Sequence, residues 1–230
     1  MKQSNLIQLT EGDPHHRGPI IQVEEWLKRH IGPEERVLEI GPGKNFFDRA
    51  NVFVDMDKRA DLPGELIYCD VCSERLPFKD KEFDLVYCRH TLEDLWNPFF
   101  AMDEMARVAK RGYIEVPSAL SEYVRGVDGL YPPFRGYHHH RWIIWVEDGA
   151  LQFVSKLALI EYSEDKGEQK LKDYLTSNPI YWNTHFTWAG SFQYRHHVGF
   201  KSSQYFSLIE RAVNHSIAST EAFWQTTGRS

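Results

Sequence analysis

The segment with the clearest chemical potential spans residues 36–45 and reads RVLEIGPGKN. The apolar run Val37–Ile40 predicts a short buried strand, and Gly41 and Gly43 follow it in a turn. Glycine has no Cβ, so the backbone can turn tightly there and a ligand can lie against it. Glu39 adds a carboxylate just before the turn. This combination suits a ligand that carries both a cationic group and hydroxyls.

The next three predicted strands also end on polar residues. These strands are Asn51–Asp55, Leu66–Cys69 and Phe83–Cys88. Asp55 closes the first, Asp70 follows the second, and Arg89 and His90 follow the third. In a parallel sheet, ligands lie outside the carboxyl ends of the strands. We therefore expect a nucleoside-type cofactor along one edge of the sheet, close to all of these side chains.

The elements between these residues predict a Rossmann-like, doubly wound and mostly parallel sheet. Apolar residues at helical spacing indicate a helix over Ile20–Ile31, which Gly32 and Pro33 end. A second helix begins at Pro98, with Asn97 as its N-cap. Only Lys44–Ala50 joins the first two strands, which leaves room for one or two helical turns at most.

The pattern changes after the fifth strand, predicted at Gly112–Pro117. Trp142–Val154 reads as a β-hairpin, because the Asp148-Gly149 pair favours a tight turn with positive φ. We expect a further strand over Thr184–Tyr194 and a closing helix over Tyr205–Ala212. The chain is therefore interpreted as a single domain over residues 1–230. Its parts are a cofactor-binding core at 36–118 and an aromatic-rich, substrate-side elaboration with the β-hairpin at 119–230.

Composition narrows the classes of partner. The 230 residues carry a formal net charge of −6, which argues against a protein that binds nucleic-acid backbones. No uncharged apolar run approaches the roughly 18 residues that a membrane span needs. The first residues lack the apolar core of a signal peptide, so the cytoplasm is the expected location. The oligomeric state is left open. The three cysteines are interpreted as free thiols, and no metal site is expected.

Taken in order, these pieces resemble the class I S-adenosylmethionine-dependent methyltransferases, and specifically their type 11 group. The resemblance covers about residues 36–118. It is carried by VLEIGPGKN (37–45), VFVDMD (52–57), CDVCSERLPFKDKEFDLVYCRHTLED (69–94) and RVAKRGYIEVPS (107–118). The run Leu76-Pro77-Phe78 ahead of Phe83 is typical of that group. The resemblance implies S-adenosylmethionine as cofactor.

The resemblance also implies roles for matching positions. Glu39 lies near the methionine ammonium, the turn through Gly41, Pro42 and Gly43 passes under it, and Asn45 follows in the same turn. Asp55 accepts hydrogen bonds from the ribose hydroxyls, for which a carboxylate has suitable paired oxygens. Met56 packs on the adenine face, and Asp70 and the Val71 amide meet the adenine edge. Arg89 lines the methionine arm.

Methyl transfer is an in-line displacement that depends on positioning, with a general base if the acceptor is a hydroxyl. Histidine titrates near neutral pH, so His90 and His140 are the candidate catalytic residues. Tyr137, His139 and Arg141 are the candidate substrate-binding residues, because Tyr137–Trp142 is interpreted as a substrate-side loop. Within it, His140-Arg141-Trp142 resembles a His-Arg-Trp pattern of the type 11 group. Two departures from the family are Asn45, where a third glycine is common, and Asp94, where histidine is common.

The sequence thus predicts an S-adenosylmethionine-dependent methyltransferase that acts on oxygen or nitrogen of a small polar acceptor, with a sugar or sugar-linked metabolite favoured. One alternative is a non-catalytic protein of the same fold that binds a ligand or partner. A nicotinamide-dependent oxidoreductase is disfavoured, because the turn lacks the Gly-x-Gly-x-x-Gly spacing and a full following helix.

Overall fold

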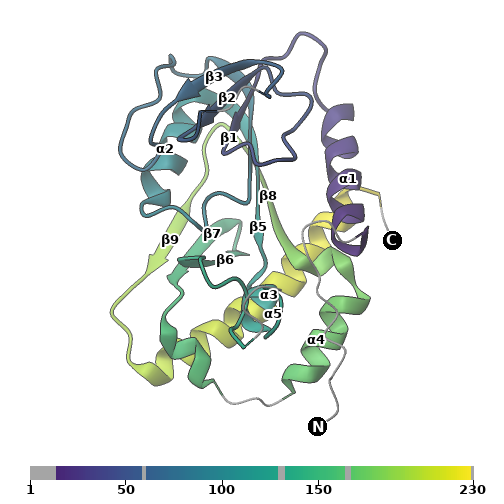
Figure 1. Ribbon diagram of the computed structural model, residues 1–230, viewed down its shortest axis with the longest axis vertical. Coiled ribbons are helices and arrows are strands. Elements are labelled where there is room, and N and C mark those ends of the chain that lie inside the picture. Colours follow the sequence, from purple (N-terminus) through teal and green to yellow (C-terminus); the bar gives the residue numbers. More distant parts are fainter. Residues whose placement is uncertain (1–13, 59–60, 129–132, 164–166, 229–230) are drawn as a thin grey trace.

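The computed structural model describes residues 14–58, 61–128, 133–163 and 167–228, with side chains from residue 19 onward. A six-stranded sheet with the order β3-β2-β1-β4-β5-β8 forms its centre (Figure 1). The five strands from β1 to β5 pair in parallel, and β8 pairs antiparallel with β5. This arrangement confirms the mostly parallel Rossmann-like sheet predicted from the sequence.

The elements follow the predicted order closely. The strands of this sheet are β1 (Val37–Ile40), β2 (Val52–Asp55), β3 (Glu65–Tyr68), β4 (Phe83–Arg89), β5 (Ala109–Pro117) and β8 (Asn183–Ala189). The α-helices are α1 (Pro14–Arg29), α2 (Pro98–Val108), α3 (Ala119–Tyr123), α4 (Glu168–Ser177) and α5 (Ser202–Thr226), and the 3-10 helices are η1 (Ala158–Tyr162) and η2 (Pro179–Trp182). Asn97 caps α2 as predicted, since its side chain accepts a hydrogen bond from the Phe100 amide.

Side chains of the strands alternate between the two faces of the sheet, as extended backbone requires. One face packs against α1 and the last turns of α5; its buried strand residues include Val37, Phe53, Leu85, Tyr87 and Tyr113. The other face packs against α2 and a second sheet; its buried strand residues include Leu38, Val54, Val86, Cys88 and Ile114. Figure 1 shows α1 and α2 on opposite sides of the sheet.

The connection from β1 to β2 contains no helix, in line with its short length. Phe47 fills the space that a crossover helix would cover. Its side chain is fully buried and stacks on Tyr87, with ring centroids 4.5 Å apart. One aromatic side chain, in place of a packed helix, therefore holds the backbone of this connection against the sheet.

A second, three-stranded sheet covers part of the first. It contains β6 (Trp142–Glu147), β7 (Ala150–Ser155) and β9 (Tyr194–His197), in the order β6-β7-β9. The predicted hairpin is confirmed, with Asp148 and Gly149 at φ values of 52° and 71°. The single strand expected over Thr184–Tyr194 is wrong. Gly190, at φ 74°, ends β8, and the chain then continues as β9 in the other sheet.

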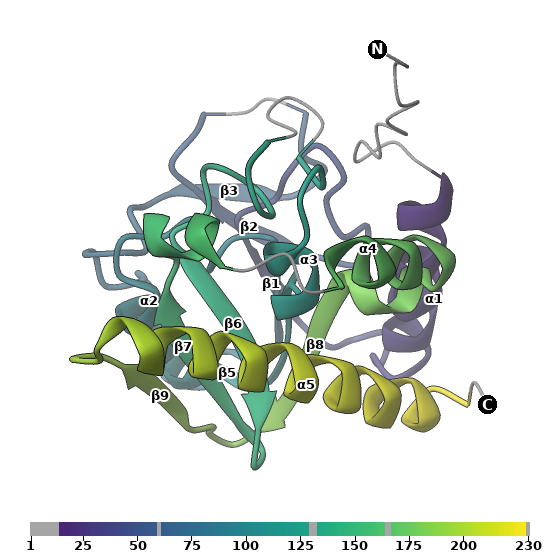
Figure 2. The ribbon, with the colours of Figure 1, turned by 90° about the horizontal axis from the view of Figure 1, so that it is seen from below.

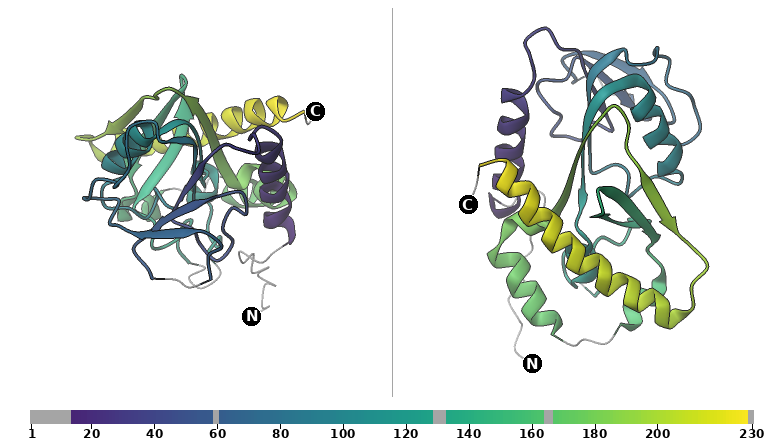
Figure 3. Two further views of the ribbon diagram at one scale, coloured as in Figure 1. Left: turned by 90° about the horizontal axis from the view of Figure 1, so that it is seen from above. Right: turned by 180° about the vertical axis from the view of Figure 1, so that it is seen from behind.

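The closing helix is much longer than the predicted Tyr205–Ala212. α5 contains 25 residues, because buried positions continue at helical spacing through Ser216, Thr220 and Phe223. It crosses the lower half of the molecule and ends beside α1 (Figures 2 and 3). Of the helices that the structure describes, none is both long and apolar enough to cross a membrane. Residues 1–13, on which the expected lack of a signal peptide rests, lie outside the described residues.

The three cysteines are free, as expected. Cys69 and Cys88 are buried, and Cys72 is half-buried. Burial raises the pKa of the Cys69 thiol to about 11, so this thiol stays protonated at neutral pH.

Candidate functional site

The glycine turn lies at the carboxyl end of β1, directly against the segment that follows β4. Gly41 has φ 68°, and its amide donates to the Val54 carbonyl at 2.9 Å. A Cβ on Gly41 would lie 2.2 Å from the Thr91 hydroxyl oxygen, so only glycine fits there. A Cβ on Gly43 would meet nothing within 4 Å. The turn is therefore closed on the side of Thr91 and open at Gly43.

Two charged side chains hold this turn from beneath. Glu39 is 2% exposed, and its Oε2 accepts a hydrogen bond of 2.8 Å from the Phe47 amide. Arg89, at the end of β4, donates to the Asn45 carbonyl at 2.8 Å. Burial lowers the pKa of Arg89, but the groups around it, Tyr87, Glu115 and Glu24 ahead of Glu39, raise it above its ordinary value. Between them, Arg89 and Glu39 hold the two ends of the segment from Asn45 to Phe47.

The remaining predicted cofactor residues lie along the same edge, at the ends of β2 and β3. Asp55 accepts a hydrogen bond of 3.0 Å from the Asp57 amide, which fixes the turn that carries Met56. Met56 is 52% exposed, an unusual position for a methionine. Asp70 accepts from the Cys72 amide at 2.9 Å and from the Ser73 hydroxyl at 2.7 Å. Val71, next to it, is buried.

His90 lies between two buried carboxylates. Its Nδ1 is 3.3 Å from Glu93 Oε1, and its Nε2 is 3.5 Å from Glu115 Oε1. Its backbone has φ 49°, and its amide donates to the Glu115 carbonyl at 2.9 Å. Burial by itself would lower the pKa of His90, but the two carboxylates raise it to about 9. The imidazole is therefore protonated at neutral pH.

Glu115 is the centre of a buried polar network that the sequence analysis did not identify. Its carboxylate accepts hydrogen bonds from the Tyr113 hydroxyl and from the Asn183 amide, the latter at 2.8 Å. His185 Nδ1 lies 2.8 Å from the Tyr113 hydroxyl and 3.5 Å from Glu115 Oε2. Burial opposes ionisation, but the neighbouring histidines lower the pKa of Glu115 well below its ordinary value. The network joins β5, β8 and the end of β4.

The 137–142 loop docks on the segment that follows β4, although the two lie far apart in sequence. The Arg141 amide donates to the Glu93 carbonyl at 2.8 Å, and Arg141 Nε donates to the Asp94 carbonyl at 3.0 Å. The guanidinium also lies over the Trp96 ring, 3.6 Å from its centroid. Trp142 Nε1 donates to the Leu95 carbonyl at 2.8 Å. His139 and His140 are thereby brought beside Asp94.

His140 is buried, and the Glu122 carboxylate holds one of its ring nitrogens. Its Nδ1 lies 2.6 Å from Glu122 Oε1. Lys156 also donates to Glu122, and Lys156 donates to the Tyr137 carbonyl at 2.6 Å. Burial opposes ionisation of Glu122, but Lys156 and His140 lower its pKa to about 2. The carboxylate stays charged and fixes the orientation of the His140 ring.

The structure thus brings most predicted site residues to one edge but adds partners that were not predicted. Glu93, Glu115 and Glu122 are each about 1% exposed, and each holds a histidine of the site. Only Glu115 had a signal in the sequence, because an acidic residue at an inward position of an apolar strand needs a partner. The other two are distinguished only by the tertiary contacts that bury them.

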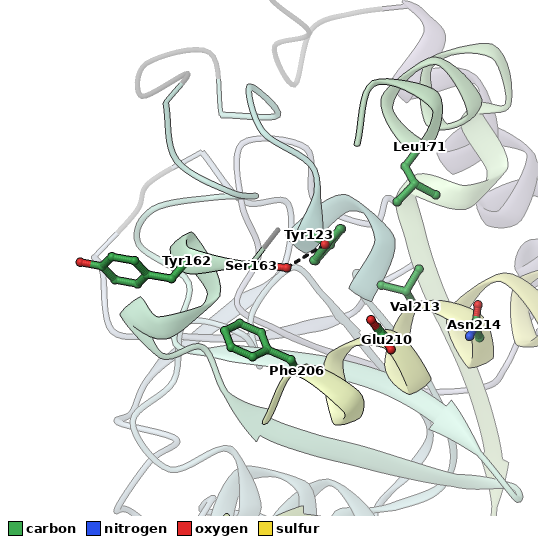
Figure 4. A pocket seen from close by; sticks show the side chains of 8 residues that line it. All are labelled: Tyr123, Tyr162, Ser163, Leu171, Phe206, Glu210, Val213 and Asn214. Carbon is green, nitrogen blue, oxygen red and sulfur yellow. Dashed lines mark hydrogen bonds between the residues drawn. The ribbon is translucent and has the colours of Figure 1, made fainter. Parts of the chain in front are cut away.

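A cavity of about 530 Å³ lies elsewhere, among α3, α4, α5 and η1 (Figure 4). Its lining includes Tyr123 and Phe206, and Tyr123 bonds to the Ser163 hydroxyl at 2.8 Å. None of the predicted site residues lines it. This cavity is therefore separate from the sheet edge formed by the carboxyl ends of β1 to β4.

The strand order, the glycine turn and the acidic strand ends together define a class I methyltransferase fold. Residues 24–114 match the model of a methyltransferase domain family, the type 11 group. S-adenosylmethionine is the cofactor of this family. Two features of the described residues fit this cofactor. The turn is open at Gly43, and the side chain of Met56, next to Asp55, is exposed.

Several known proteins resemble parts of the chain. The uncharacterized protein MJ1123 of Methanocaldococcus jannaschii is 39% identical over 95 residues, which are 38% of this chain and 45% of that protein. The match therefore spans less than half the length of this relative. The YcgJ protein of Bacillus subtilis is 21% identical, with a TM-score of 0.36 over 45% of this chain and 52% of that chain. An S-adenosylmethionine-dependent methyltransferase of Thermotoga maritima is 20% identical, with a TM-score of 0.35 over 45% and 57%.

Proposed function

We propose that the whole chain is an S-adenosylmethionine-dependent methyltransferase that acts on oxygen or nitrogen of a small polar acceptor. One observation carries the proposal: the 137–142 loop is docked on the segment after β4, beside the glycine turn that Thr91 contacts. A cofactor edge and a second group of polar side chains therefore share one end of the sheet. S-adenosylmethionine supplies an electrophilic methyl group when it is bound.

The residues of the edge have distinct tasks in this proposal. Gly41, Pro42, Gly43 and Asn45 provide the backbone that follows the methionine part, with Glu39 and Arg89 fixing its course. Asp55 accepts from the ribose hydroxyls, and Met56 covers one face of the adenine. Asp70 and the Val71 amide meet the adenine edge. The carboxylate oxygens of Asp70 already accept one hydrogen bond each, and each keeps a second acceptor site.

The acceptor side consists of Tyr137, His139, His140 and Arg141. Rings and polar atoms alternate over this loop, and the Tyr137 and His140 rings lie 4.6 Å apart between centroids. Such a surface suits a hydroxylated ring, which offers both apolar faces and hydroxyls. A sugar or sugar-linked metabolite is the acceptor class that we propose.

His90 has a positioning role in this proposal. A general base must be neutral, whereas the pKa of about 9 keeps His90 protonated at neutral pH. Its charge instead binds the segment after β4 to Glu115 of β5. Burial lowers the pKa of His140, but Glu122 raises it above its ordinary value, so this histidine also favours the charged form. His140 stays the predicted catalytic residue of the 137–142 loop, with a task in holding the acceptor beside the methyl group.

The cofactor assignment can be tested by calorimetry with S-adenosylhomocysteine, the demethylated product. We expect wild-type protein to bind it and Asp55→Ala to bind it at least about 10-fold more weakly, because two charge-assisted hydrogen bonds are lost. Asp57→Ala is the matched control, since Asp57 is exposed and only its amide contacts Asp55. Absence of binding by wild-type protein at high micromolar concentration contradicts the proposal.

A second function, ligand or partner binding without turnover, is favoured by one observation. The connection after β1 contains no helix, and Asn45 and Asp94 stand where the type 11 group commonly has glycine and histidine. Asp55→Ala also separates the two: a biological effect that survives this change does not depend on the cofactor. For either function we propose a small-molecule ligand, a single domain and a cytoplasmic location.

A further inference from the structure

Three side chains beside the acceptor loop have the composition of a metal site. One ligand atom each from Asp94, His139 and His140 lies within 4.8 Å of the other two. Two imidazoles and one carboxylate form a donor set that binds divalent transition metals and leaves coordination positions open. We propose that these residues bind a divalent transition-metal cation of the Zn²⁺ class.

No metal site is expected from the sequence, and side chains of adjacent residues such as His139 and His140 rarely converge on one ion. The loop geometry removes this objection. The His139 and His140 rings lie 4.5 Å apart between centroids and stand at 75° to each other. His139 Nε2 is 3.9 Å from Asp94 Oδ1, so the first ring also faces the carboxylate.

His140 has the orientation that metal-binding histidines require. Its Nδ1 is held by Glu122 Oε1 at 2.6 Å, which leaves Nε2 as the nitrogen that coordinates a cation. Pairing of the second ring nitrogen with a carboxylate fixes the tautomer and strengthens the ligand. Lys156 forms an ion pair with Glu122, so the carboxylate that orients His140 is itself held in place.

A buried carboxylate adds negative charge close to the proposed ligands. Glu93 precedes Asp94 and is 1% exposed. Its Oε1 faces His90, whereas Oε2 has no hydrogen-bond partner among the described residues. A buried carboxylate oxygen without a partner is costly, and a nearby cation offsets that cost.

The position of the site suggests what the cation does. Asp94 follows the segment of Thr91, which contacts the glycine turn, and His139 lies in the acceptor loop. Given the proposed methyltransferase function, an oxygen or nitrogen of the acceptor takes an open coordination position. A bound cation lowers the pKa of such a group and orients it. Metal binding itself does not depend on that function.

A neighbouring triad provides a competing arrangement. Asp128, His138 and His139 also place ligand atoms within 4.8 Å of one another. His138 Nδ1 lies 2.6 Å from Asp128 Oδ2, so a close pair already occupies that nitrogen. Because His139 belongs to both groups, Asp94 and His138 are the residues that distinguish them.

The test uses Co²⁺ as a spectroscopic probe on the full chain, previously treated with a chelator. We expect visible absorption bands that saturate at one equivalent and disappear when Zn²⁺ displaces Co²⁺. Asp94→Asn and His139→Ala should each weaken Co²⁺ binding by about 100-fold, since loss of an outer-shell partner already costs about 10–100-fold. Both side chains are about half exposed, so folding should be unchanged by circular dichroism.

His138→Ala is the matched control and should leave the Co²⁺ titration unchanged. No absorption change with wild-type protein overturns the proposal. Loss of binding in His138→Ala, with binding kept in Asp94→Asn, overturns it in favour of the neighbouring triad. Binding of S-adenosylhomocysteine is measured separately on the same samples, so failure of the metal site and failure of the proposed function give different results.

Discussion

His90 shows how single residues of this site combine charge with position. A protonated imidazole between Glu93 and Glu115 compensates two carboxylates that burial would otherwise destabilise. Its φ of 49° is uncommon for a residue with a Cβ, and such strain persists only where neighbouring contacts hold it. The histidine is therefore a fixed part of the edge.

The pKa of His90 predicts how stability depends on pH. Its folded-state pKa of about 9 lies above the ordinary 6.5, so protonation stabilises the folded state. The contribution is fully present below pH 6.5 and is lost as the pH rises through about 9. This shift corresponds to roughly 3 kcal/mol of unfolding free energy. Urea unfolding across this pH range measures it.

His90→Asn is the control, because asparagine tolerates the left-handed backbone and does not titrate. We expect this variant to be less stable than wild type at pH 6.5 and to lose the dependence on pH between 6.5 and about 9. An equal decline in the unfolding free energy of both proteins over this pH range would show that a group other than His90 causes the pH dependence.

The turn after β1 is the element on which the cofactor proposal depends. Its two glycines serve different purposes. Gly41 adopts φ 68° against the Thr91 side chain, whereas a Cβ on Gly43 points into open space. Gly41 is therefore required by the fold, and Gly43 is required only where a ligand lies against the turn.

This difference predicts opposite effects of two alanine substitutions. Gly41→Ala should lower the unfolding free energy by about 1–3 kcal/mol, through positive φ and contact with Thr91. Gly43→Ala should leave stability nearly unchanged but weaken S-adenosylhomocysteine binding. Denaturant unfolding and calorimetry on both variants check this. Equal binding by Gly43→Ala and wild type would show that the ligand does not pass over this glycine.

At the scale of the whole molecule, α5 links the C-terminal half to the core. Phe223, near its end, stacks on His185 of β8 with ring centroids 4.5 Å apart, and meets Trp26 of α1 at 5.7 Å. His185 in turn contacts the Glu115 network. Through Phe223 and His185, α5 therefore packs against the Glu115 network at the end of the sheet.

Phe223→Ala should destabilise the protein by about 3–5 kcal/mol, as expected when a buried phenylalanine is truncated. The neighbouring Gln225→Ala is the control, because Gln225 is exposed on the same helix and should cost little. Thermal or urea unfolding of both variants gives the comparison. Equal stability would mean that α5 is not part of the cooperative core.

The order of the elements could be predicted from the sequence because their signals are local. Val37–Ile40, the Asn97 cap and the Asp148-Gly149 turn each depend on a few neighbouring residues, and all three are confirmed. The errors came where local signals are ambiguous. Gly190 divides an aromatic stretch between two sheets, and α5 continues past the apolar positions that marked its start.

The sequence by itself determined the sheet and the edge at which we propose a ligand, because strand ends and glycine turns are set by short-range pattern. Only the tertiary structure decided what surrounds the histidines. Glu93, Glu115 and Glu122 hold His90 and His140 through contacts between distant segments, and burial gives those contacts their strength. The same packing brings Asp94 beside His139, a proximity that no spacing in the sequence encodes.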